Sequence, residues 1–153
     1  MKSGPSELTD HLGYWLRLLS NHVSEAFAER LGRHEVSVPQ WVVLRVLFDH
    51  DSLPLKEVVA RVGVDQGSLS RMVERLMARG LVERREDTAD RRAVAISLTG
   101  EGRWLVPMLA READENDRVF FAPLSEQKRG EFLEMIRVLI AASASTDRGV
   151  PLR

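Results

Sequence analysis

Apolar side chains recur at helical spacing along most of the chain, and the clearest stretch lies in its middle. One stripe falls at positions i, i+3, i+4 and i+7 and consists of Leu69, Met72, Val73 and Leu76, as on one face of an α-helix. Asp65 precedes the stripe, where its carboxylate can cap free N–H groups, and Gly80 follows it, where a left-handed residue commonly ends a helix. The pattern predicts a short helix with one buried side.

The opposite face of this helix, which we call the recognition helix, is polar. It carries Gln66, Gly67, Ser70, Arg71, Glu74, Arg75 and Ala78. The side chains of its first turn are small or able to hydrogen-bond, so nothing bulky keeps that end away from a groove. One side therefore suits a protein core, and the other suits a polar, concave partner.

A second short helix is predicted just before the recognition helix. Its apolar face consists of Leu55, Val58, Val59 and Val62. Only Gly63 and Val64 separate this pattern from Asp65. Two short helices joined by a short turn that contains glycine are typical of a helix-turn-helix.

Two strands are predicted after the recognition helix, over residues 81–85 and 93–98. In the second, Val94, Ile96 and Leu98 alternate with Ala93, Ala95 and Ser97, which is the pattern of a half-buried strand. The connection over residues 86–92 is polar apart from one alanine, as expected for a solvated hairpin tip. The predicted fold class is mostly α with a small β-hairpin wing, a winged helix-turn-helix.

Several motifs resemble the MarR family of bacterial transcriptional regulators. They are Gly80-Leu81-Val82-Glu83-Arg84, Asp90-Arg91-Arg92 with the strand that follows to Thr99, Gly102-Arg103, Val38-Pro39-Gln40-Trp41 and Leu124-Ser125-Glu126. The resemblance covers roughly residues 8–142, and the wing motif is its most specific part. Val59 departs from the smaller alanine usual in the family, and Gly67 lacks the polar side chain of many relatives.

Helices are also expected on both sides of this lobe. The patterns predict helices over 8–31, 38–49, 100–121 and 126–142, with a capping box from Ser37 and Gln40, a cap at Thr99, a turn over 51–54 and a kink at Pro107. We expect one domain in which residues 37–99 form the DNA-binding lobe and residues 8–35 and 100–142 form dimerisation helices. Residues 1–7 and 143–153 are expected to be mobile.

The first helix and the last two carry more apolar surface than one small core needs. Packing against a second copy would bury this surface, and two-fold symmetry is the commonest arrangement. The resemblance likewise implies a homodimer joined through a bundle of its N- and C-terminal helices. Two recognition helices about 34–36 Å apart would select a pseudo-palindromic site on double-stranded DNA.

Composition and charge narrow the alternatives. The 153 residues carry a net charge of −1, but residues 61–92 hold eight arginines against six acids, a local excess of +2. DNA binding requires a positive face rather than a basic chain. There is no cysteine, which excludes disulfides and thiol-based sensing. Neither a signal peptide nor a membrane span is indicated, so we expect a soluble, cytoplasmic protein.

Nine residues are candidates for DNA contact: Gln66, Gly67, Ser68, Ser70, Arg71 and Arg75 on the recognition helix, and Asp90, Arg91 and Arg92 at the wing tip. Arginine pairs with guanine and glutamine with adenine in the major groove, and arginine also suits a narrow minor groove. The family's Asp-x-Arg wing motif falls on Asp90 and Arg92. The alternative is that these residues contact no DNA and form only an ordinary solvated helix face and a charged hairpin tip.

A sensing site is harder to locate. Members of the resembled family often bind a small aromatic or phenolic acid between the lobe and the dimer bundle, which loosens DNA binding. Candidate ligand-binding residues there are Tyr14, Trp15, His22, Trp41 and Trp104; the alternative for each is plain core packing. The spacing of the four histidines indicates no metal site, and no cofactor is expected.

The function class follows from these patterns and from what is missing. The sequence has no G-x-S-x-G, Walker loop or H-E-x-x-H motif, so we predict that it is not an enzyme. The resemblance implies a repressor that a ligand releases from its operator. A winged helix used only for protein–protein contact is the alternative, and the salt dependence of a gel shift separates the two.

Overall fold

The computed structural model describes residues 5–86 and 94–146. Contacts group the chain into two compact units, residues 1–116 and residues 117–153. The elements in chain order are the 3-10 helix η1 (Leu8–Asp10), α1 (Leu12–Gly32), α2 (Val38–Phe48), β1 (Leu53–Pro54), α3 (Leu55–Val62), α4 (Gln66–Ala78), β2 (Val82–Glu86), β3 (Val94–Leu98), α5 (Gly100–Phe120) and α6 (Glu126–Thr146). The predicted division into a lobe and dimerisation helices stays a prediction.

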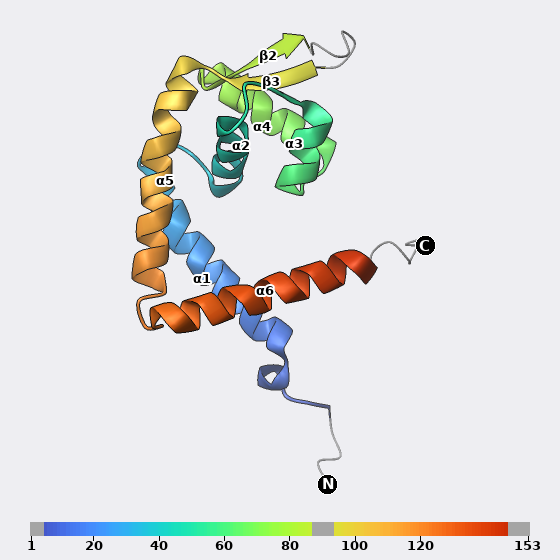
Figure 1. The fold of residues 1–153 in the computed structure, drawn as a ribbon, viewed down its shortest axis with the longest axis vertical. Coiled ribbons are helices and arrows are strands. Elements are labelled where there is room, and N and C mark those ends of the chain that lie inside the picture. The colour runs from blue at the N-terminus through green and yellow to red at the C-terminus, as the bar shows by residue number, and fades with distance from the viewer. Residues whose placement is uncertain (1–4, 87–93, 147–153) are drawn as a thin grey trace. The chain divides into compact units, whose positions relative to one another are not determined.

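The helix-turn-helix prediction is confirmed. α3 ends at Gly63, whose φ of +74° is left-handed, and α4 begins after the Asp65 cap. Leu69, Val73 and Leu76 are buried on the inner side of α4. Gly80 has a φ of +70° just after the helix, where glycine avoids the strain that a Cβ would impose. Figure 1 shows α2, α3 and α4 gathered next to β2 and β3.

The sheet has three antiparallel strands in the order β1-β3-β2. β2 and β3 form the predicted hairpin, with Val82 opposite Leu98 and Arg84 opposite Ile96. The predicted turn over 51–54 is wrong in its second half, because Leu53 and Pro54 pair with β3 as an additional edge strand. Proline is tolerated there since an edge strand does not need every N–H for the ladder.

The prediction that β3 is half-buried is also wrong. Ala95, Ile96, Ser97 and Leu98 are all buried, and only Val94 is exposed, at 43%. β3 is the central strand of the sheet, and α2 and α3 contact it as well. The Ser97 hydroxyl donates to Glu83 Oε1 at 3.3 Å, which compensates for the removal of this polar group from water.

The helix boundaries agree with the predictions apart from two termini. The first helix does not run without interruption from Leu8, because His11 has an extended backbone between η1 and α1. The last helix continues to Thr146, beyond the predicted end at residue 142; the expected mobility of residues 143–153 stays a prediction. Two alanines precede Ser143, and alanine has the highest intrinsic helix propensity.

Local caps explain where α2 and α5 begin. The Gln40 amide N donates to Ser37 Oγ at 3.3 Å, and the Ser37 amide N donates to Gln40 Oε1 at 2.9 Å, which confirms the capping box. Thr99 Oγ1 accepts from the Gly102 amide at 3.1 Å and donates to the Gly80 carbonyl at 2.6 Å. Thr99 therefore caps α5 and ties its start to the end of the recognition helix.

One apolar core joins the elements of the first unit. It includes Leu31 of α1, Leu44 and Leu47 of α2, Val58 of α3, Leu69, Val73 and Leu76 of α4, Ile96 of β3 and Leu109 of α5. In the part of the chain that the structure describes, no helix combines the length and the apolar character that crossing a bilayer requires.

Candidate DNA-binding surface

The outer face of α4 is available to a partner in the first unit. Gln66, Gly67, Arg71 and Arg75 are exposed, and Ser68 and Ser70 are half-buried. The inner face of the same helix packs into the core. The structure therefore places these six candidates on one short helix, with four of them exposed to solvent.

The first turn of α4 contains a small polar network. Asp65 Oδ1 accepts from the Ser68 amide at 2.8 Å, and the Ser68 hydroxyl donates to Asp65 Oδ2 at 2.6 Å. Arg71 donates to the same hydroxyl at 3.3 Å. Ser68 is thus engaged in capping and in orienting Arg71, whereas the Gln66 side chain is exposed.

The Asp65 cap predicts a pH dependence of stability. Hydrogen bonds from the Ser68 side chain and amide, together with the Arg71 charge, hold the pKa of Asp65 below its usual 3.8. Because the folded-state pKa is the lower one, the stabilisation is complete above pH 3.8 and is lost as the pH falls through the folded value. The Asp65→Asn variant can still cap but cannot titrate.

We therefore expect wild type to melt at a higher temperature than Asp65→Asn at neutral pH, and this difference should shrink in acid. Thermal unfolding followed by circular dichroism across the acid range measures it. A difference that stays constant as the pH falls would show that the charge of Asp65 does not contribute.

Carboxylates neutralise the arginines at the base of the wing. Arg85 donates from Nε and Nη2 to Glu83 Oε1 at 2.9 and 2.6 Å, and these bonds lower the pKa of Glu83. Arg84 lies 3.9 Å from the Glu74 carboxylate on α4. Sequence reasoning missed both pairs, although Glu83 and Arg85 are two apart on a strand, where side chains share a face. Asp90, Arg91 and Arg92 lie outside the described residues.

The predicted ligand-binding residues lie on three helices. Tyr14, Trp15 and His22 are on α1, Trp41 is on α2 and Trp104 is on α5. The rings of Tyr14 and Trp15 meet edge to face at 5.2 Å, and Trp15 donates to the Thr9 carbonyl at 2.9 Å.

Trp41 and Trp104 differ strongly in their surroundings. Trp41 meets Phe27 at 6.3 Å and packs against the core. Trp104 is 69% exposed and borders a shallow depression with Leu81 and Glu101. The structure thus brings Tyr14 to Trp15 and Trp41 to Phe27, and it leaves Trp104 open to solvent.

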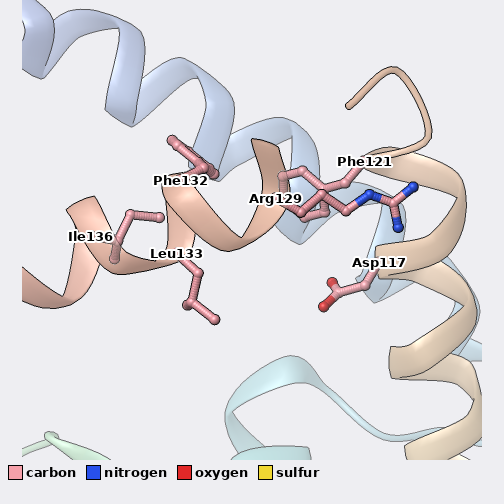
Figure 2. A pocket seen from close by; sticks show the side chains of 6 residues that line it. All are labelled: Asp117, Phe121, Arg129, Phe132, Leu133 and Ile136. Carbon is pink, nitrogen blue, oxygen red and sulfur yellow. The ribbon is translucent and has the colours of Figure 1, made fainter. Parts of the chain in front are cut away.

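The second unit contains an apolar cavity that sequence reasoning did not single out. Its volume is about 300 Å³, and it is lined by Asp117, Phe121, Arg129, Phe132, Leu133 and Ile136. Figure 2 shows the apolar side chains along α6 and the Asp117 carboxylate and the Arg129 guanidinium together at one end. Arg129 Nε also donates to the Leu124 carbonyl at 3.1 Å. The available signal was the helical spacing of Phe132, Leu133 and Ile136, which predicts one apolar face on the last helix.

A helix-turn-helix, a β-hairpin after it and an exposed polar face on the second helix define a winged helix-turn-helix protein. The comparisons with known proteins agree. The sequence profile of the MarR family matches residues 36–94. The transcriptional repressor NicR of Pseudomonas putida is 29% identical over 136 residues, which cover 89% of this chain and 86% of NicR.

Two further similarities extend the comparison. The transcriptional regulator TtmR of Methylorubrum extorquens is 35% identical over 104 residues, or 68% of this chain, and the match spans about half of TtmR, 53% of its length. The solved structure of BpsR from Bordetella bronchiseptica superimposes with a TM-score of 0.83 at 29% identity, covering 89% of this chain and 97% of that one. The chain belongs to the MarR family of transcriptional regulators.

Proposed function

We propose that this protein is a repressor that binds a pseudo-palindromic operator as a homodimer, with α4 in the major groove. The observation that carries the proposal is the outer face of α4, on which Gln66, Arg71 and Arg75 are exposed around the small Gly67. Glutamine and arginine are the usual partners of adenine and guanine there. Arg91 and Arg92, at the predicted wing tip, are proposed to enter the neighbouring minor groove.

Exposed apolar side chains support a homodimer. On α1, Leu12, Trp15 and Leu16 are 47–80% exposed, and on α6, Leu133, Met135, Val138, Leu139 and Ile140 are 47–62% exposed. Apolar surface of this extent usually marks an interface. A second copy that covers such side chains would also supply the second recognition helix that a pseudo-palindromic site requires.

A small aromatic acid is the proposed effector. The DNA binding of BpsR, which is similar to this chain over most of its length, is regulated by 6-hydroxynicotinic acid. Tyr14, Trp15, His22, Trp41 and Trp104 are the proposed contacts. A ligand can bind better to a form in which the spacing of the two recognition helices does not match the DNA. Such a ligand lowers the fraction of protein that is able to bind DNA, and the operator is released.

Fluorescence anisotropy tests the proposal directly. The protein is titrated into labelled DNA from the region flanking its own gene at two salt concentrations, with and without 6-hydroxynicotinic acid. Tight binding of two protomers that weakens with salt supports the repressor, because phosphate contacts release counterions. The absence of binding at low salt by a protein that is dimeric would favour the protein–protein module instead.

Arg71→Ala tests the recognition helix. We expect operator affinity to fall about tenfold or more, with relaxed preference at one base pair, because a bidentate arginine–guanine contact discriminates by about 1–3 kcal/mol. Arg111→Ala on α5 removes the same charge from another exposed position and is the control. Equal affinities of the two variants would remove Arg71 from base recognition.

A further inference from the structure

The turn between α1 and α2 is tied to the end of the recognition helix. Arg79, which caps the C-terminus of α4, donates to the carbonyl oxygen of Glu35 at 2.5 Å and to that of His34 at 3.1 Å. Its guanidinium also lies 3.9 Å from the Glu35 carboxylate. Because the planar guanidinium presents its donors as a fixed fork, one side chain can hold both carbonyls.

Glu112 of α5 holds the same turn from another direction. Its two carboxylate oxygens lie 3.4 Å from Arg30 Nη1 and 3.6 Å from His34 Nε2. These three side chains are only 19–24% exposed, so solvent and salt screen their interactions less than at an open surface. His34 therefore contacts α5 through its ring and the end of α4 through its carbonyl oxygen.

The backbone of this turn has an unusual conformation. Glu35 has a φ of +56° and is the only non-glycine residue with a positive φ in the part of the chain that the structure describes. The amides of His34 and Glu35 bond back to the carbonyls of Leu31 and Gly32 at 2.9 and 3.0 Å. A left-handed glutamate persists only where its surroundings hold it, and the two bonds from Arg79 provide such support.

We propose that Arg79 and Glu112 are positioning residues for DNA binding. Acting through the turn over residues 33–36, they fix the orientation of α4 relative to α1 and α5. The inference rests on the proposed function. It adds a route by which structural changes in α1 or α5 would alter the orientation of the recognition helix. Arg79 and Glu112 would therefore affect sequence-specific binding, which needs two correctly placed recognition helices, more than non-specific binding.

Glu112→Gln gives the sharpest test, because positioning and simple charge predict opposite results. Removing an acid makes the protein more positive, which alone should tighten binding to all DNA. We expect affinity for a specific duplex to fall about tenfold, within the range of measured coupling effects, with binding to a scrambled duplex unchanged or slightly tighter. Asp114→Asn removes the same charge from an exposed position of α5 and should leave the ratio of the two affinities at the wild-type value.

Arg79→Lys separates positioning from phosphate contact. Lysine keeps the charge but loses the fork, so we expect the same loss of specific affinity with an unchanged dependence on salt. A phosphate contact would instead be preserved by lysine, and Arg79→Met would flatten the plot of log affinity against log salt by about one counterion.

The specific duplex is selected by the wild-type protein from a random-sequence pool, and anisotropy is measured well below the melting temperature of each variant. If the wild-type protein enriches no sequence, the proposed function fails and this inference fails with it. The other outcome is that the wild-type protein enriches a sequence, and that Glu112→Gln and Arg79→Lys prefer this sequence over scrambled DNA as strongly as wild type does. That outcome overturns this inference and leaves the proposed function standing.

Discussion

Replacing Val138 and Leu139 with glutamate is expected to convert the protein into a folded monomer with at least about 100-fold weaker operator binding. Both side chains are more than half exposed on α6, so the substitution costs the isolated chain little. In the proposed dimer they would be covered, and buried carboxylates without partners are strongly unfavourable. Loss of the second recognition helix removes an avidity gain of about 10²–10⁴. Sedimentation equilibrium and anisotropy measure the two effects.

The matched control adds the same charge elsewhere on α6. Gln127→Glu combined with Lys128→Ala also lowers the net charge by two, and both positions are exposed and polar. This variant should remain dimeric. A Val138→Glu, Leu139→Glu protein that is still a dimer at micromolar concentration would show that this part of α6 is not the interface.

Gly102→Ala is expected to lower the free energy of unfolding by about 1–3 kcal/mol, the usual range for overpacking a buried site. A Cβ at this position would overlap the carbonyl oxygen of Leu81 and lie 3.1 Å from Leu98 Cδ2. The start of α5 must therefore move away from the chain that enters β2. For a protein of this size, the melting temperature should fall by about 2–4 °C per kcal/mol.

Gly130→Ala on α6 is the control, and we expect it to raise the free energy of unfolding rather than lower it. A Cβ at Gly130 meets nothing within 4 Å, so alanine should stabilise the helix by up to about 1 kcal/mol through its higher propensity. Urea unfolding at a fixed protein concentration measures both variants, since dimerisation makes stability depend on concentration. A Gly102→Ala protein as stable as wild type would show that the contact with Leu81 is easily relieved.

The comparison of α4 with β3 shows which features a sequence pattern can predict. The limits of α4 follow from Asp65 and Gly80, and its buried side follows from a repeat of three and four residues, all within one short segment. The alternation in β3 was equally clear, yet Ala95 and Ser97 are buried as well. Alternating apolar and polar residues indicate that a strand has two different faces. They do not indicate whether other elements of the fold cover the polar face.

The candidate DNA-binding residues were predictable for the same local reason. A helix with one apolar stripe exposes its other side, so the exposure of Gln66, Arg71 and Arg75 followed from periodicity. The engagement of Ser68 with Asp65 is a local cap of three residues. By contrast, the different exposures of Trp41 and Trp104 depend on which other elements reach each ring, and no local pattern around either residue indicates this.

The sequence by itself determined the elements, their caps and the polar face of the recognition helix, because each depends on residues a few positions apart. Only the tertiary structure decided that Leu53 and Pro54 join the sheet, that Arg79 holds the carbonyls of residues 44 and 45 positions earlier, and that Glu112 reaches Arg30 across 82 positions. Such pairs form when packing brings distant segments together. The residue pattern within one segment does not indicate which distant segment it contacts.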